Sequence, residues 1–595
     1  MASNVNLGGE LMKTTSRRSM GAILVIAYLT VIAWSSGASA RMEFGNLEVS
    51  GEIFVLAEGQ WNSGSNDRVE FALTPGVPGL FLNPSQISGG ATHGSPNRDR
   101  FDHLTAFRTE VLIEMVYRGI PRVTPVVKLR PFYDAMFDIN DKQGNISDAW
   151  ETNVTSGLND RYDPLVREAY LDFAFHPVSI RAGRQIATWG RSDGVTVLDV
   201  VTPRNFRNPL TFEQERMMIP QWMINMKFDL TRLDWLPGGI SKELQVIWNL
   251  DYRPAYFPGI DNQNEGQHPW TLGVVDFANQ IVNESEGLFP PGGDFSGNGV
   301  ANGEFFDGDK YREGDAFDKS EVFVRWRAKT GDGLGLLSDM TYSFHYAYLF
   351  EDVPFYELRG RTNFGFAFPF AHARSDGGGI DLERHRYQLV GFSFDKALMF
   401  LPGQFQGTVM RGEMSYNIGN KFYEADFATH EANQLQTLIG LDQYLYIGPK
   451  RFIKTPWFTS FQWWRDEILR DPGPGVTTIL NGAACSLQPH CGREGYVIGG
   501  QTNMFTGMRK RTRDVLTLFM FNDFLPGKTL HVELFGLHEL GGWQASTWLR
   551  GVVGYSFNSR ITGRVGINVI QGQDEAFFGQ FKKTSSAFAE MKFTF

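Results

Sequence analysis

The sequence predicts an all-β fold, a single transmembrane antiparallel β-barrel of about eighteen strands with long external loops and short periplasmic turns. Three observations predict it. Segments of about 10 to 16 residues with period-two hydrophobicity recur along the chain. Long and short connections alternate between these segments. The chain also carries 49 Phe, 19 Tyr, 14 Trp and 65 Gly but only 2 Cys, which suits membrane strands and turns better than a disulfide-rich secreted scaffold.

The first forty residues are typical of a secretory signal. Lys13, Arg17 and Arg18 form a basic region, an apolar run follows from Gly21 to Trp34, and Ala38-Ser39-Ala40 is a small-x-small cleavage site. The alternative is a membrane anchor, but the run is shorter than the roughly 20 residues that a spanning helix needs. We therefore expect a cleaved signal peptide over 1–40, a barrel over 41–595, and export to the bacterial outer membrane.

The strands are expected at segments that alternate apolar and polar side chains. They are 46–61, 104–118, 122–134, 164–176, 179–189, 218–230, 241–252, 319–331, 338–350, 381–396, 404–417, 433–448, 454–466, 511–523, 528–540, 544–557, 559–571 and 583–595.

The connections support a barrel with both termini on the periplasmic side. The long ones are 62–103, 135–163, 190–217, 253–318, 351–380 and 467–510, and most of those between them are short. The junction 541–543 is too short for this rule, so sixteen strands is the alternative count. Three short connections contain Leu-Pro-Gly, in which Pro ends the strand and Gly supplies positive φ.

The last strand places Met591, Phe593 and Phe595 on one apolar face and ends the chain on an aromatic residue. This ending resembles the signal read by the outer-membrane assembly machinery, so that machinery and outer-membrane lipids are the expected partners. The alternative is an ordinary edge strand that ends in Phe.

A charge on the lipid face at mid-depth costs roughly 2 to 4 kcal/mol, so strand charges should point into the lumen. The inward charges assigned in this way are Arg108, Glu110, Glu114, Lys128, Arg130, Glu168, Asp172, Arg325, Arg327, Arg411, Arg550 and Arg564. With further assignable strand residues, they give twelve basic against seven acidic side chains. Two interpretations follow, a wet pathway that favours anions or polar solutes, and ion-pair ladders that brace the wall.

The densest motif covers residues 181–207, RAGRQIATWGRSDGVTVLDVVTPRNFR. Its apolar stretch Val195–Leu198 should fold over or into the pore as a constriction, although a braced external loop is the alternative. The candidate pore and constriction residues are Arg181, Arg184, Trp189, Arg191, Asp193, Asp199, Arg204 and Arg207.

Two details of strand pairing follow from the same region. A bulge at Gly183, or an earlier strand end, would bring Arg184 off the lipid face. A hairpin turning at Pro177-Val178 would place Asp172 opposite Gly183, close enough to pair with Arg184. Segments 511–523 and 528–540 are apolar on both faces, so their inner face should contact an inserted loop.

The motif carries a resemblance. Gly183-Arg184-Gln185, Trp189-Gly190, Asp193-Gly194, Asp199-Val200 and Pro203-Arg204-Asn205-Phe206 resemble a widespread family of large bacterial outer-membrane proteins, porin-like in form, labelled only as a domain of unknown function. Gly440-Leu441-Asp442-Gln443 and the closing hairpin also fit. The resemblance implies an outer-membrane barrel and, more weakly, a hydrophobic cargo handled with envelope lipid-transport components.

Other chemistry has little support in the sequence. Cys485 and Cys491 should form a disulfide in an external loop, and two cysteines without clustered His do not make a metal site. There is no haem-attachment motif, P-loop or G-x-S-x-G, so no cofactor and no enzymatic activity are expected. The net charge of −10 gives no support for nucleic-acid binding.

We therefore expect an outer-membrane channel that passes polar or anionic solutes through a charged lumen. The alternatives are a transporter of lipids or other hydrophobic compounds with envelope partners, and a barrel sheath for an extracellular electron-transfer cytochrome.

Overall fold

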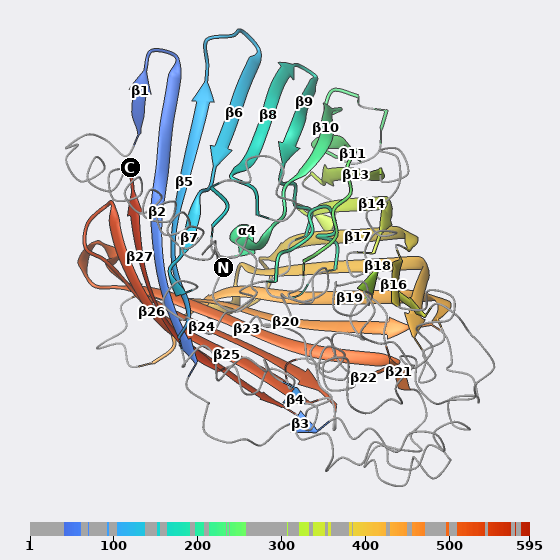
Figure 1. Ribbon diagram of the computed structural model, residues 1–595. Coiled ribbons are helices and arrows are strands. Elements are labelled where there is room, and N and C mark those ends of the chain that lie inside the picture. The colour runs from blue at the N-terminus through green and yellow to red at the C-terminus, as the bar shows by residue number, and fades with distance from the viewer. Residues whose placement is uncertain are drawn as a thin grey trace, which may run out of the picture.

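The computed structural model describes a β-barrel wall and parts of the segments that join its strands (Figure 1). The described residues are 41–60, 69–70, 92–93, 104–136, 152–154, 163–190, 195, 197–206, 214–233, 235–236, 239–256, 306–307, 320–331, 337–351, 355–358, 380–383, 385–423, 429–448, 455–469, 496–498, 508–541, 545–572, 578 and 585–595. The expected signal peptide over 1–40 and the expected disulfide between Cys485 and Cys491 lie outside them.

The wall consists of eighteen antiparallel strands in chain order, each paired with its neighbours in sequence, and the last pairs with the first. The strands are β2 (Leu47–Gln60), β5 (Leu104–Tyr117), β6 (Val123–Leu129) with its continuation β7 (Phe132–Asp134), β8 (Val166–Phe175), β9 (Val178–Gln185), β10 (Gln221–Asp229), β11 (Ser241–Asn249), β13 (Glu321–Lys329), β14 (Thr341–Phe350), β17 (Arg386–Leu398), β18 (Thr408–Tyr423), β19 (Thr429–Leu445), β20 (Trp457–Ile468), β23 (Thr512–Phe524), β24 (Leu530–Leu540), β25 (Ser546–Ser556), β26 (Ile561–Gly572) and β27 (Ser586–Thr594).

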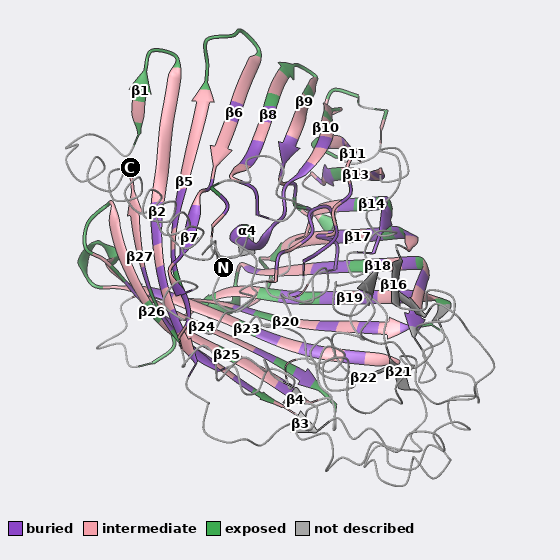
Figure 2. Cartoon of the chain, viewed as in Figure 1, coloured by how far each residue is buried: buried purple, intermediate pink, exposed green. Residues whose placement is uncertain are grey.

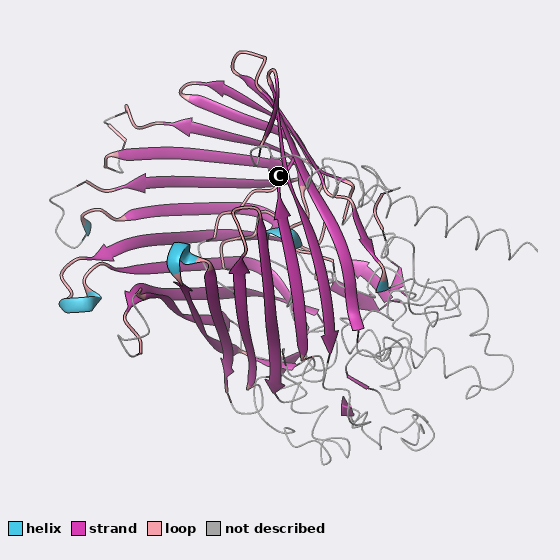
Figure 3. Cartoon of the chain, turned by 90° about the vertical axis from the view of Figure 1, so that its left-hand side faces the viewer, coloured by secondary structure: helices cyan, strands magenta, loops and turns pink. Residues whose placement is uncertain are grey.

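Each predicted strand therefore overlaps an observed one, and eighteen is the correct count. Figure 3 shows the tilted strands side by side around the wall. Shorter strands lie outside this ring: β1 (Met42–Phe44) extends the wall beside β2, and three small sheets contain β3 (Val69–Glu70) and β4 (Thr92–His93), β12 (Phe306–Asp307), β15 (Phe355–Leu358) and β16 (Ile380–Glu383), and β21 (Tyr496–Ile498) and β22 (Met508–Lys510).

The turns follow the expected chemistry where they are described. Gly403 has φ 62° and Gly527 has φ 74°, so both Leu-Pro-Gly turns use glycine for a positive φ. Each leads into a short 3₁₀ segment, η5 (Gly403–Phe405) or η7 (Pro526–Lys528).

Burial in the wall is inverted relative to a water-soluble sandwich. Large apolar side chains such as Phe107, Leu171 and Val565 are exposed, whereas Arg108 and Glu110 on the opposite face are buried. Figure 2 shows buried and exposed residues alternating along strands such as β18 and β19. An apolar exterior around a polar interior is the pattern of a barrel surrounded by lipid, and the protein is a bacterial outer-membrane β-barrel.

Among the described residues, no helix is both long and apolar enough to cross a membrane.

The barrel closes where the chain ends. Phe595 donates its backbone N–H to the carbonyl of Gly51 at 2.8 Å, and Gly51 donates back to Phe595 at 2.9 Å. A Cβ atom on Gly51 would lie 2.4 Å from the carbonyl oxygen of Leu112 and 2.7 Å from Cζ of Phe595. The closing seam therefore needs glycine at this position.

We predict that Gly51→Ala weakens barrel closure, because overpacking of this kind costs roughly 1 to 3 kcal/mol. The folded barrel should melt at lower temperature in a heat-modifiable gel-mobility assay. Gly551→Ala is the matched control, since its Cβ would meet its nearest neighbours at 3.8 Å. Equal melting of the two variants would contradict the role given to the seam.

Candidate pore constriction

The connection between β9 and β10 leaves the wall and enters the barrel. The first part of this connection, residues 186–206, is called its outgoing part. It contains Val197, Leu198 and Val201, which are at most 1% exposed. They belong to one apolar cluster with inward side chains of nine strands, namely Met223, Ile247, Phe323, Ala347, Leu349, Tyr387, Leu389, Leu438, Trp464, Val515 and Leu537. Residues 186–220 are called the inserted segment below.

Trp189 of the inserted segment contacts three neighbouring strands of the wall, β11, β13 and β14. Its indole N–H donates to Gln245 Oε1 on β11 at 3.1 Å. Its ring lies 5.6 Å from that of Phe323 on β13 and 5.1 Å from that of His345 on β14, centroid to centroid. The indole therefore combines apolar burial with a satisfied donor.

Leu198 extends the contact to the next two strands. Its backbone N–H donates to Glu413 Oε2 on β18 at 3.3 Å. A Cβ on Gly391 of β17 would lie only 2.4 Å from Leu198 Cδ2, so the leucine fits against a bare backbone. The outgoing part thus touches the wall from β11 to β18.

Polar residues of the motif hold the shape of the outgoing part. Asp199 accepts from the backbone N–H of Trp189 at 2.9 Å and from the guanidinium of Arg204 at 3.3 Å. The Thr202 hydroxyl accepts from the N–H of Ala187 at 3.0 Å and donates to its carbonyl at 2.8 Å. A Cβ on Gly190 would lie 2.7 Å from Asp199 Cβ, which explains the glycine after Trp189.

The last part of this connection, residues 214–220, is called its returning part. It contains a single helical turn, α4 (Gln214–Met217), which lies inside the curve of the wall in Figure 1. Asn205 donates its N–H to the carbonyl of Met217 at 2.6 Å, and Ile219 donates to that of Pro203 at 2.8 Å. These bonds tie the returning part to the outgoing part.

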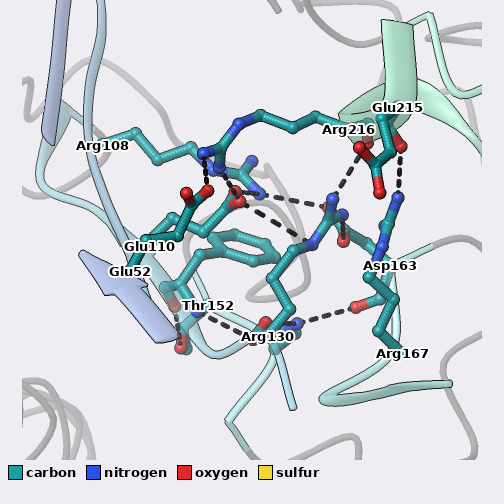
Figure 4. A network of polar contacts seen from close by, with 11 residues as sticks. Glu52, Arg108, Glu110, Arg130, Thr152, Asp163, Arg167, Glu215 and Arg216 are labelled. Carbon is teal, nitrogen blue, oxygen red and sulfur yellow. Dashed lines mark hydrogen bonds and ion pairs between the residues drawn. The ribbon is translucent and has the colours of Figure 1, made fainter. Parts of the chain in front are cut away.

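Ion pairs anchor α4 to the strands on the other side of the barrel (Figure 4). Arg216 pairs with Glu110 on β5 and, at 2.5 Å, with Glu52 on β2. Its guanidinium also lies 4.1 Å from the ring centroid of Phe54. Removing one partner from a buried pair of this kind costs far more than the pair contributes, because the other charge is left desolvated.

Neighbouring arginines complete this anchor. Arg130 donates to the carbonyl of Arg216 at 2.9 Å, and Arg167 donates to that of Glu215 at 2.5 Å. Asp163 pairs with Arg130 and, at 3.2 Å, with Arg108. These residues are called the arginine cluster: Arg108, Arg130, Arg167 and Arg216 with Glu52, Glu110 and Asp163.

The inserted segment is therefore held at two places on the wall by different chemistry. Apolar packing holds its outgoing part against β10 to β24, and the arginine cluster holds α4 against β2, β5, β6 and β8. Its described residues consequently reach across the lumen from one group of strands to the other.

The structure brings together some of the predicted constriction residues and separates others. Trp189, Asp199 and Arg204 are in direct contact within the inserted segment. Arg181 stays in the wall, and Arg184 is fully buried at the end of β9. Arg191, Asp193 and Arg207 lie outside the described residues.

The predicted pairing of Asp172 was wrong. The hairpin turns at His176-Pro177, one residue earlier than expected, so Asp172 lies opposite Arg181 and not Gly183. Arg181 and Asp172 form two hydrogen bonds, at 2.7 and 2.9 Å. Pairing continues without a register shift through Gly183, which has φ 132°, and β9 ends four residues earlier than the predicted segment.

Most of the predicted inward charges form ion pairs with neighbouring strands. Lys128 bridges Glu114 and Glu168, and one arginine on each of β13, β18, β25 and β26 pairs with an acid. The four arginine–acid pairs are Arg325–Glu243, Arg411–Asp442, Arg550–Glu533 and Arg564–Glu590. Arg327 is the exception, with no ion pair to the described part of the chain.

The sequence count omitted several inward acids. Glu52, Glu243 and Glu533 pair with Arg216, Arg325 and Arg550, so the inner wall is less basic than the count of twelve against seven suggested. The period-two alternation of β11 and β24 places Glu243 and Glu533 on the inner face, so the sequence was sufficient to identify both. The contact between Arg216 and Glu110 spans 106 residues of chain and leaves no local signal.

A model of the family described as "Protein of unknown function (DUF1302)" matches residues 21–473. A comparison with curated proteins gives no match.

Three solved structures that are similar to this chain are those of the outer-membrane protein OpdK and of OccK5 (OpdH), both from Pseudomonas aeruginosa, and of OccAB1 from Acinetobacter baumannii. Their identities are 7%, 9% and 8%, and their TM-scores are 0.41, 0.39 and 0.41. The alignments cover 93%, 92% and 93% of this chain and 100%, 98% and 97% of the other chains. Similarity at this level gives no information about which solute this chain transports.

We predict that Arg216→Met loosens α4 without dissolving the barrel. Loss of one partner from a buried ion pair costs about 3 to 5 kcal/mol, so the amides of Asn205 and Ile219 should exchange with solvent far faster. Hydrogen exchange read by mass spectrometry measures this. Arg181→Met is the matched control, because it breaks the Arg181–Asp172 ion pair without touching the inserted segment, and the same acceleration in both variants would contradict the anchor.

Proposed function

We propose that this chain, which belongs to the DUF1302 family of proteins of unknown function, is an outer-membrane channel that passes polar or anionic solutes through a charged lumen. The observation that carries the proposal is the polar inner wall behind an apolar exterior. Side chains such as Asn225, Gln245 and Arg325 face the lumen, and interiors of this kind hold water and conduct solutes.

The inserted segment supplies the selectivity in this proposal. It narrows the lumen with Trp189 and Leu198 on one side and with the arginine cluster on the other. A solute must pass the remaining cross-section, so its size and charge are tested there. The anchors keep the narrow part rigid, which a selective constriction requires.

One observation favours the second candidate, a transporter of hydrophobic compounds. The inner faces of β23 and β24 present Val515, Phe535 and Leu537 to the apolar cluster, as the sequence led us to expect. An apolar solute would have to displace the inserted segment to reach this surface. We therefore rank it second, because the polar wall needs no such movement.

The test is conductance of the purified protein in a planar lipid bilayer. We predict a stable open channel that conducts chloride better than potassium. Trp189→Ala should raise the single-channel conductance, because it deletes a ring from the narrow part and loosens its contact with Gln245.

Phe344→Ala is the control, since Phe344 is 52% exposed on the outer face of β14 and its loss should leave conductance unchanged. A correctly folded protein that never conducts would contradict the channel and favour the transporter of hydrophobic compounds. Preference for potassium over chloride would contradict the anionic pathway alone.

A further inference from the structure

Two inward cations differ from the other charges of the wall. Lys227 on β10 and Arg327 on β13 are both exposed, and neither has a hydrogen bond or ion pair within the part of the chain that the structure describes. By contrast, Lys128, Arg181 and Arg411 each face a carboxylate at 3.0 Å or less. A paired charge presents a weak dipole to the lumen, whereas an unpaired cation presents its full field.

Strand parity places both side chains inside the barrel. On β10 the inward series is Met223, Asn225 and Lys227, and Met223 belongs to the apolar cluster of the lumen. On β13 the inward series runs from Glu321 through Phe323, which touches Trp189, and Arg325 to Arg327. The lipid-facing neighbours of Arg327 include Trp326.

The two cations flank one strand. Lys227 lies opposite Gln245 of β11, and Arg327 lies opposite Glu243 of the same strand. Strands are spaced about 4.8 Å apart and rise about 3.4 Å per residue, so the two Cα atoms lie about 12 Å from each other. Gln245 and Glu243 of β11 lie between them, so the two cations face the lumen from either side of this strand.

The nearby acids form no ion pair with either cation in the described part of the chain. Glu243 lies opposite Arg327 on β11, but its carboxylate pairs with Arg325, whose guanidinium is 3.9 Å away. Asp229, at the end of β10, accepts a hydrogen bond from the backbone N–H of Thr231 at 3.0 Å. Asp339 lies 3.6 Å from Lys329, at the end of β13. Lys227 and Arg327 therefore remain unpaired among the described residues.

The pair also lies beside the narrow part of the lumen. Gln245, opposite Lys227, accepts from the indole of Trp189, and Arg327 lies two residues beyond Arg325 toward the short-turn end. Lys227 and Arg327 each lie two residues from the end of their strand at the short turns. A solute that has passed Trp189 meets them at the periplasmic mouth.

We propose that Lys227 and Arg327 form an anion subsite at the periplasmic mouth and that this pair, more than the paired charges of the wall, sets the preference for anions. The inference rests on the proposed channel and names its selectivity residues. The subsite would bind small anions as they pass through the channel. The two cations attract such an anion, but the site has no bidentate geometry and no burial that would bind it tightly.

The test is the reversal potential across a bilayer in a potassium chloride gradient. The double variant K227Q/R327Q should shift the reversal potential toward zero, with channels still formed, because the two unpaired cations are gone. K227R/R327K should retain the wild-type value, since it exchanges the side chains and keeps both charges.

R122Q/K528Q is the matched control. It removes one arginine and one lysine, both exposed, from the short turns that follow β5 and β23, and the reversal potential should stay at the wild-type value. Heat-modifiable mobility establishes that each variant is folded. An unchanged reversal potential in conducting K227Q/R327Q channels overturns this inference alone. A folded wild-type protein that never conducts contradicts the proposed function and this inference with it.

Discussion

Backbone hydrogen bonds between the last strand and the first hold the wall closed. Lipid offers no partner for a free N–H or carbonyl, so a sheet inside a membrane must close on itself. Gly51 and Phe595 complete that closure. Once the ring is closed, apolar residues occupy the exterior and charges the interior, and interior charges that are buried from water are stabilised by pairing with each other.

The paired charges explain how the inner wall can be both charged and stable. Cross-strand pairs such as Arg181–Asp172 and Arg564–Glu590 link neighbouring strands around the lumen. The inserted segment uses the same principle at Arg216 but relies on apolar packing at Leu198. One connection thus spans two chemically different surfaces, and its contacts with both fix its position in the lumen.

The sequence predicts the wall well because its signal is local. Alternation with period two is enforced at every strand by lipid on one side and water on the other, so strand positions and inward residues such as Arg108 could be inferred. Register is harder, because a turn placed at Pro177-Val178 and not at His176-Pro177 moves Asp172 to a different partner. Contacts across the lumen, such as Leu198 with Glu413, join residues 215 positions apart and have no local signature.

Adjacent residues of one strand face lipid and water in turn, and fluorescent labels in place of Trp326 and Arg327 would report the two environments separately. With Cys485 and Cys491 replaced by serine, a single cysteine at either position would carry a fluorophore in the barrel reconstituted into vesicles. The label at 326 should be quenched by a lipid-dissolved quencher, and the label at 327 by a water-soluble one. Equal quenching of both labels by the same reagent would contradict the barrel, because neighbouring residues would then share one environment.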